Sequence, residues 1–259
     1  MRTSSNDLLP ISETMLIPLS ARAAETGRDN PIISDKKSVE IISKIDTANK
    51  VIDGGKVSSH GILARTKVID DEVKKILAEN PDATIINLGA GLDTRICRVD
   101  NGILKWYDLD LPEVISVRRQ FFSENERIRF ISKSVLDSAW VSEINTSGSV
   151  VIIAEGLLMY FTEENVALIF ELLANHFPEA HMFFDVIHTF FINKKISSTF
   201  LWGIDNAKDI EKLDARVKLI QSWSTGNLLK NRQPLLLKIF NFLPSTRNRS
   251  QVLHVQFTR

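Results

Sequence analysis

Short apolar runs alternate with amphipathic stretches from residue 83 onward. Several of these runs are continuously apolar, which is typical of parallel strands covered by helices on both faces. Helices are predicted between them at Pro112–Asn125 and at Glu163–His176, the second with Thr162 as its N-cap. Alternating strands and helices indicate a doubly wound α/β fold. The predicted strands are Thr84–Leu88, Leu104–Asp108, Arg129–Ser132, Val150–Ala154 and Met182–Val186.

The first part of the chain, residues 1–82, has helical patterns and no strong strand pattern. Asn80-Pro81 ends the last predicted helix, because a residue that precedes proline avoids the helical region. We therefore expect residues 1–82 to form an N-terminal helical cap that belongs to the same domain as the sheet. The predicted helices of this cap are Ser12–Glu25, Ser38–Asp46 and Leu63–Glu79.

The remainder, residues 83–259, is expected to form the core of the domain. An insert at about 188–225 lies after the fifth predicted strand, on the side where a substrate would bind. The pattern there predicts an amphipathic helix at Ile204–Ser222, and the alternation of Val252–Phe257 predicts a final strand.

The amino-acid composition limits the classes of protein to which this chain can belong. The 259 residues include 32 Lys and Arg against 32 Asp and Glu, so no net basic charge favours nucleic acid or an anionic membrane. Cys97 is the single cysteine, which excludes an internal disulfide, and we expect it to be a small core residue. No apolar window is long enough for a transmembrane helix, and no secretory signal is evident, which indicates a cytoplasmic protein. The five histidines lack metal-ligand spacing, so no metal is expected.

A glycine-containing loop follows the first predicted strand, in Asn87–Arg95 (NLGAGLDTR). Gly89 and Gly91 allow a sharp turn and a close approach of a ligand to the backbone. Asp110 lies about 20 residues beyond them, the spacing expected of a βαβ unit that binds a nucleoside, and its carboxylate suits a ribose diol. The sequence therefore predicts a nucleoside cofactor at the carboxyl ends of these strands.

The same loop distinguishes between two possible cofactors, S-adenosylmethionine and NAD. A dinucleotide site would prefer a third small residue where the pyrophosphate meets the helix, whereas this chain has Asp93 and Thr94 there. A carboxylate repels a pyrophosphate but tolerates a ligand with an ammonium and a sulfonium. The loop thus favours S-adenosylmethionine over NAD, and an NAD-dependent oxidoreductase is the alternative from another enzyme class.

Beyond these features, the chain resembles the leucine carboxyl methyltransferase family, and most closely its bacterial branch, which includes polyketide O-methyltransferases. The likeness covers roughly residues 12–187. It implies a seven-stranded, mostly parallel class I methyltransferase sheet and methyl transfer to a carboxyl or hydroxyl group of a small, polyketide-like or aromatic molecule. An inactive cofactor-binding relative is a further alternative. The segments that carry the likeness are Leu19–Thr26 (LSARAAET), His60–Asp70 (HGILARTKVID), Asn87–Arg95, Tyr107–Pro112 (YDLDLP) and Ala154–Phe161 (AEGLLMYF).

The resemblance also implies ligands for S-adenosyl-L-methionine. Arg65 would hold the methionine carboxylate with its planar fork. Gly89 and Gly91 would pass close to the methionine part and the ribose, and Asp110 would bind the ribose hydroxyls. Asp108 is a rival for that role, although we expect it one step deeper, where it would support the glycine loop.

Two further regions complete the implied cofactor site. The family has an Asp-Leu pair beside the adenine, and this chain departs from it with Ser134 and Val135, followed by Asp137. We expect Asp137 to meet the adenine amino group, with Ser134 and Val135 as backbone contacts. Glu155 would lie near the ammonium or the sulfonium, and its burial would require a cationic partner.

The acceptor side is less defined. Arg22 would lie near the mouth of the site. It could contact the cofactor, contact an acidic substrate or form a structural ion pair, and these three possibilities stay open. Tyr160 could pack against the cofactor or the acceptor. An aromatic-rich stretch, Phe190–Trp202, would suit a flat apolar acceptor. No residue is marked as a general base, and nothing indicates an oligomeric state.

Overall fold

The structure is a computed structural model that describes residues 10–45, 55–146, 148–192, 199–235 and 250–259. Parts of all the predicted regions therefore lie outside the described residues. These are residues 1–9 and 46–54 of the expected cap, residues 193–198 of the expected insert, and residues 147 and 236–249 of the expected core.

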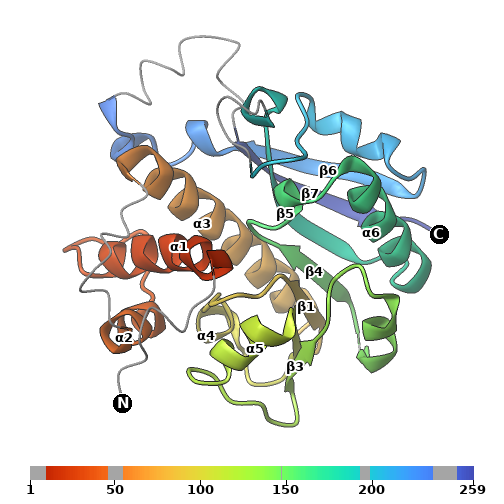
Figure 1. Ribbon diagram of the computed structural model, residues 1–259, viewed down its shortest axis with the longest axis horizontal. Coiled ribbons are helices and arrows are strands. Elements are labelled where there is room, and N and C mark those ends of the chain that lie inside the picture. The colour runs from red at the N-terminus through yellow and green to blue at the C-terminus, as the bar shows by residue number, and fades with distance from the viewer. Residues whose placement is uncertain (1–9, 46–54, 147, 193–198, 236–249) are drawn as a thin grey trace.

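A seven-stranded sheet forms the centre of the molecule in the order β3-β2-β1-β4-β5-β7-β6 (Figure 1). Strands β1 to β5 are parallel to one another, whereas β7 runs antiparallel to both β5 and β6. The predicted doubly wound, mostly parallel sheet is confirmed. The strands are β1 (Thr84–Leu88), β2 (Lys105–Asp110), β3 (Ile128–Ser132), β4 (Val150–Ala154), β5 (His181–Ile187), β6 (Val217–Ser224) and β7 (Ser250–Phe257).

Helices cover both faces of the sheet. One face packs against α3 and α4 through side chains such as Val73 and Ile96, and the other packs against α6 through Ile169 and Phe170. A smaller core joins α1 and α2 to the loop after β1. None of the described helices is long and apolar enough to cross a membrane. The α-helices are α1 (Pro10–Thr26), α2 (Lys36–Lys44), α3 (Gly55–Glu79), α4 (Ile96–Val99), α5 (Pro112–Arg118) and α6 (Glu163–His176).

Short 3₁₀ helices fill several connections. They are η2 (Ser138–Glu143), η3 (Leu158–Tyr160), η4 (Thr189–Ile192), η5 (Ala207–Lys212), η6 (Thr225–Asn227) and η7 (Lys230–Arg232).

The predicted helix at Ile204–Ser222 is wrong. This region contains η5 followed by β6, which pairs with β7 and has a register shift between Leu219 and Gln221. Apolar residues such as Ile210 and Val217 do recur at helical spacing, but each one packs into the core from an irregular or extended segment. Pairing with the free edge of β7 therefore overrides the local pattern.

Two other expectations differ from the structure. The helix predicted to reach Asn125 ends at Arg118, and the Asn125 side chain instead accepts hydrogen bonds from the N–H groups of Arg127 and Ile128 in a turn. Cys97 is exposed on α4 rather than buried in the core, because the buried side of this short helix is formed by Ile96 and Val99.

The carboxyl ends of the central strands meet at one edge of the sheet. Register pairs Leu88 with Leu109 and Asp110 with Ser132, so the loops after β1, β2 and β3 emerge side by side. Between β1 and β4 the chain order reverses, which is the point where open α/β sheets bind ligands.

Candidate functional site

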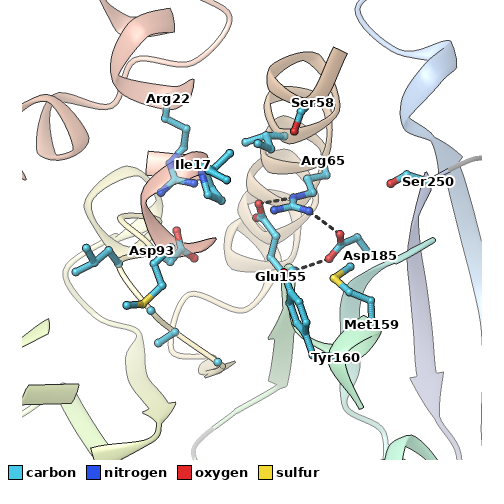
Figure 2. Close-up of a pocket in the computed structure, with 18 of the residues that line it drawn as sticks. Ile17, Arg22, Ser58, Arg65, Asp93, Glu155, Met159, Tyr160, Asp185 and Ser250 are labelled. Carbon is cyan, nitrogen blue, oxygen red and sulfur yellow. Dashed lines mark hydrogen bonds and ion pairs between the residues drawn. The ribbon is translucent and has the colours of Figure 1, made fainter. Parts of the chain in front are cut away.

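Two adjoining cavities lie at this edge of the sheet. The first has a volume of about 300 Å³ and is lined on one side by α1 and α3. Arg22 reaches it from α1, and Ser58 and Arg65 reach it from α3 (Figure 2). The second has a volume of about 500 Å³ and lies against the end of β2. They share part of their lining, so one elongated ligand can occupy both. The shared residues are Met15, Gly89, Gly91, Gly156 and Tyr160.

The glycine loop lies where the two cavities meet and lines both of them. Gly89 and Gly91 have φ values of +64° and +46°, a backbone conformation that side chains with a Cβ rarely adopt. The loop is tied to β2, because the Gly91 N–H donates to Oδ2 of Asp110 at 2.8 Å. The other oxygen of Asp110 accepts from the Leu111 N–H at 2.7 Å, and each oxygen keeps a lone pair for a ligand. Burial raises the pKa of Asp110, which lines the second cavity.

Asp108 lines neither cavity. Its carboxylate is fully buried and accepts hydrogen bonds from Trp106, Asn87 and Arg118. The buried Arg118 side chain in turn donates Nη1 to the carbonyl oxygens of Gly91 and Asp93, at 3.0 and 2.9 Å. The structure thus places Asp108 beneath the glycine loop, which it supports through Arg118.

Arg65 links the ends of β4 and β5. Its Nε donates to Oε1 of Glu155 at 2.9 Å, and its Nη1 donates to Oδ2 of Asp185 at 2.7 Å (Figure 2). Thr66 adds a bond to Glu155 at 3.1 Å, and the Gly156 N–H donates to Asp185. Arg65 therefore faces the first cavity as a guanidinium that is already held by two carboxylates.

Arg95 holds the other side of Glu155. This fully buried guanidinium donates to Oδ1 of Asp70 at 2.7 Å, to Oδ2 of Asp93 at 2.5 Å and to Oε2 of Glu155. Although burial opposes the charged form, Arg95 and Arg65 hold the pKa of the Glu155 carboxyl well below its usual range. The predicted requirement for a cationic partner of Glu155 is met twice.

Asp35 connects the cap to this cluster. Its Oδ1 caps α2 by accepting from the Ser38 N–H, and its Oδ2 accepts from Arg22, Thr94 and Arg98. Arg22 lines the first cavity and donates only its Nε within the described residues, at 3.0 Å, which leaves Nη1 and Nη2 available to a ligand. Burial lowers the pKa of Arg22.

The second cavity has a mostly apolar wall that includes Leu109, Val114 and Phe161. Ser134 and Val135 line it, as expected for contacts beside an adenine. Asp137 does not line either cavity. Its side chain is exposed at the start of η2, where it accepts a hydrogen bond from the Ala139 N–H.

The rest of the first cavity is largely apolar. Met159, Ile187 and Phe200 line it together with Tyr160, whose pKa is raised by burial. Of the aromatic residues expected to line the acceptor pocket, only Phe200 does so among the described ones. Trp202 belongs to the core, and Phe190 is 64% exposed.

The residues of the site that were missed from the sequence include Asp35, Arg118 and Asp185, and also the buried Asp70, Arg95 and Arg98. Asp185 follows the apolar residues Met182–Phe184 near the carboxyl end of β5, and an acid in such a position on a buried strand is the signal that could have identified it. Asp35 and Arg118 carry no such signal, because their partners lie on other elements.

The sheet order, the glycine loop and the acid at the end of β2 define a class I S-adenosylmethionine-dependent methyltransferase. The chain belongs to the leucine carboxyl methyltransferase family, whose profile matches residues 16–174. The expected family, enzyme class and cofactor are thereby confirmed, and the oxidoreductase alternative is set aside.

Named relatives agree with this assignment. The chain is 26% identical over 226 residues, 84% of each protein, to the tetracenomycin polyketide synthesis O-methyltransferase TcmP of Streptomyces glaucescens. It is 30% identical over 230 residues, 77% of each protein, to the S-adenosyl-L-methionine-dependent methyltransferase dpfgK of Gibberella zeae. The fold is similar to magnesium protoporphyrin IX methyltransferase from Synechocystis with bound SAM, with a TM-score of 0.52 and 11% identity over 82% of this chain and 90% of that one.

Proposed function

We propose that the protein is an O-methyltransferase that modifies a carboxyl or hydroxyl group of a small, largely apolar molecule such as a polyketide. The observation that carries the proposal is the apolar part of the first cavity, where Met159, Ile187 and Phe200 lie beside the end of the cofactor site. The similarity to TcmP, which is named for polyketide synthesis, supports the same class of acceptor.

Each part of the cofactor has a matching surface. Asp110 would bind the ribose diol, and Ser134 and Val135 would flank the adenine in the second cavity. In the first cavity, Nη1 and Nη2 of Arg22 and Nη2 of Arg65 donate to no other described residue, so we assign the methionine carboxylate to both arginines. Glu155 would accept from the ammonium. Residues 1–82 would act as the cap of this site and about 188–225 as the insert on the acceptor side.

The bound cofactor supplies a methyl group that its sulfonium has already activated. The chain's own contribution is therefore to hold the acceptor oxygen in line with that methyl group, and orientation alone can supply about 7–11 kcal/mol of a barrier. Side chains of α1 and α3, among them Ile17 and Ile62, line the first cavity together with Tyr160. A carboxylate acceptor needs no proton removed, whereas a hydroxyl must lose one.

The test uses the purified chain, methyl-labelled S-adenosylmethionine and pairs of aromatic acceptors that share one ring system and differ only in a carboxyl or a hydroxyl group. We expect label to enter at least one member of this panel. Mild alkali releases the label from an ester and not from an ether, which separates the two kinds of acceptor. Transfer to protein or nucleic acid, with none to small molecules, would contradict the proposal.

A further inference from the structure

The charged side chains that line the first cavity do not balance. Among the described residues, the guanidinium groups of Arg22 and Arg65 face the carboxylates of Asp93, Glu155 and Asp185. Two positive charges against three negative charges leave one negative charge at the wall.

The layer behind this wall does not correct the excess. Arg95 and Arg98 lie there, together with Asp35 and Asp70, and these four groups are paired with one another and with the wall. All four are buried or nearly so, and their charges cancel. The whole cluster therefore carries one net negative charge in a place where an unpaired charge is costly.

The negative charge that has no matching positive charge is best assigned to Asp185. Within the described part of the chain its one cationic partner is Arg65, which also binds Glu155. Glu155 and Asp93 have Arg95 as a further partner. The pKa values follow the same order, because burial raises the pKa of Asp185 above its ordinary value although Arg65 opposes this shift, whereas the arginines lower that of Glu155.

The methionine end of the cofactor contributes a carboxylate and an ammonium, which together are neutral. Only the sulfonium adds a positive charge, so only the sulfonium can balance the negative charge of the wall. Methyl transfer converts the sulfonium into a neutral thioether and removes that charge. The product S-adenosylhomocysteine then leaves the cluster with its negative charge uncompensated.

We propose that Asp185 is a specificity-determining residue that makes the cavity prefer the sulfonium cofactor over its neutral product, so that methyl transfer itself weakens the hold on the spent cofactor. This preference concerns the cofactor alone and does not depend on which acceptor the enzyme uses.

The test compares the affinities of S-adenosylmethionine and S-adenosylhomocysteine by calorimetry in the wild type and in Asp185→Asn. Asparagine keeps a side-chain oxygen that can accept from Gly156 or Arg65. We expect the variant to bind S-adenosylmethionine about tenfold more weakly, the order of effect that one partly screened charge pair produces. Binding of S-adenosylhomocysteine should be unchanged or tighter. An analogue with a protonated amine in place of the sulfonium should behave like S-adenosylmethionine.

Asp209→Asn is the matched control, because it removes the same charge from an exposed carboxylate that is paired with Lys212 outside both cavities. It should leave the affinity ratio of the two ligands unchanged. Asp93→Asn removes another carboxylate of the same wall and should shift the ratio in the same direction, which provides a second measurement if Asp185→Asn does not fold. Equal changes for both ligands in the Asp185 and Asp93 variants would overturn the proposal.

Discussion

Asp108 and Asp110 lie two residues apart on β2, yet they have different surroundings. Asp108 is enclosed by Trp106, Asn87 and Arg118, whereas Asp110 lines a cavity and binds only backbone N–H groups. Both residues lie near the carboxyl end of β2. Only Asp110, the last residue of the strand, is close enough to that end to reach a ligand.

This difference predicts separate phenotypes. Asp110→Ala should weaken binding of the whole cofactor while leaving the affinity for a fragment without the ribose diol nearly unchanged. Asp108→Asn should mainly lower stability, by about 3 kcal/mol, because it leaves the buried Arg118 charge without its partner. Calorimetry and thermal unfolding of both variants test this. Normal cofactor binding by Asp110→Ala, together with loss of binding in Asp108→Asn, would show that the ribose is on the other carboxylate.

Arg65 has two functions that one substitution removes together. Arg65→Ala should lose a charge-assisted contact with the cofactor, worth about ten- to a hundredfold in affinity. It should also lower the melting temperature. Glu155 loses one of its two arginine partners, and Asp185 loses the one arginine with which it pairs among the described residues. Arg65→Lys should recover part of both, since an ammonium cannot reproduce the fork.

A matched control lies on the same helix. Lys67 forms a half-exposed i,i+4 pair with Asp71, so Lys67→Ala should change neither the affinity nor, by more than a few tenths of a kcal/mol, the stability. Unchanged cofactor affinity in a folded Arg65→Ala protein would exclude Arg65 as a ligand of the methionine carboxylate.

At the scale of elements, the pairing of β5 with β7 contains a histidine pair. Nδ1 of His181 lies 2.9 Å from Nε2 of His254, and the ring of His254 stacks on Phe183 with a centroid distance of 4.3 Å. Burial and the neighbouring His181 lower the pKa of His254 from its ordinary 6.5 to about 4. The strand pairing therefore requires an uncharged His254.

The sign of the pH dependence follows. Between about pH 6.5 and about pH 4 the unfolded chain binds a proton at His254 that the folded chain does not, so stability falls as the pH falls through this window. The loss should reach about 2–3 kcal/mol. His254→Phe removes the titrating group and should flatten this part of the curve, measured as the urea midpoint between pH 7 and 4.5. His176→Gln, at the exposed end of α6, is the control, and an identical pH profile for wild type and His254→Phe would refute the assignment.

How much of each element could be predicted depends on where its partners lie. The parallel strands β1 and β4 were predicted with their observed bounds, since both are almost wholly buried and largely apolar, and α6 begins at the Thr162 cap as expected. The edge strand β6 was missed because only Val217 among its eight residues is buried and its pairing with β7 is not visible in its own pattern.

The site follows the same rule. The glycine loop and Asp110 form a local unit and were recognised from their spacing, whereas Asp185 meets Arg65 across 120 residues of chain. Asp137 lies outside both cavities, because the turn that it caps leaves it exposed, and its expected contact with the adenine stays a prediction.

At the scale of the whole molecule, the cap and the sheet are joined by buried charges as well as by apolar contacts. Asp35 reaches from the start of α2 to Arg98 on α4, and Asp70 on α3 binds both Arg95 and Arg98. The helices that line the first cavity are thus fixed to the segment after β1, which lines the same cavity.

The insertion of β7 between β5 and β6 has a consequence for how the chain is made. β7 is the last strand in chain order, and residues 188–249 are synthesised between β5 and β7. At about 5–20 residues per second, β5, whose Phe183 and Phe184 side chains belong to the cores on opposite faces of the sheet, lacks its partner strand for several seconds. During that interval the nascent chain presents an unpaired, strongly apolar strand edge, so translation speed and chaperone access after residue 187 should influence the yield of folded enzyme.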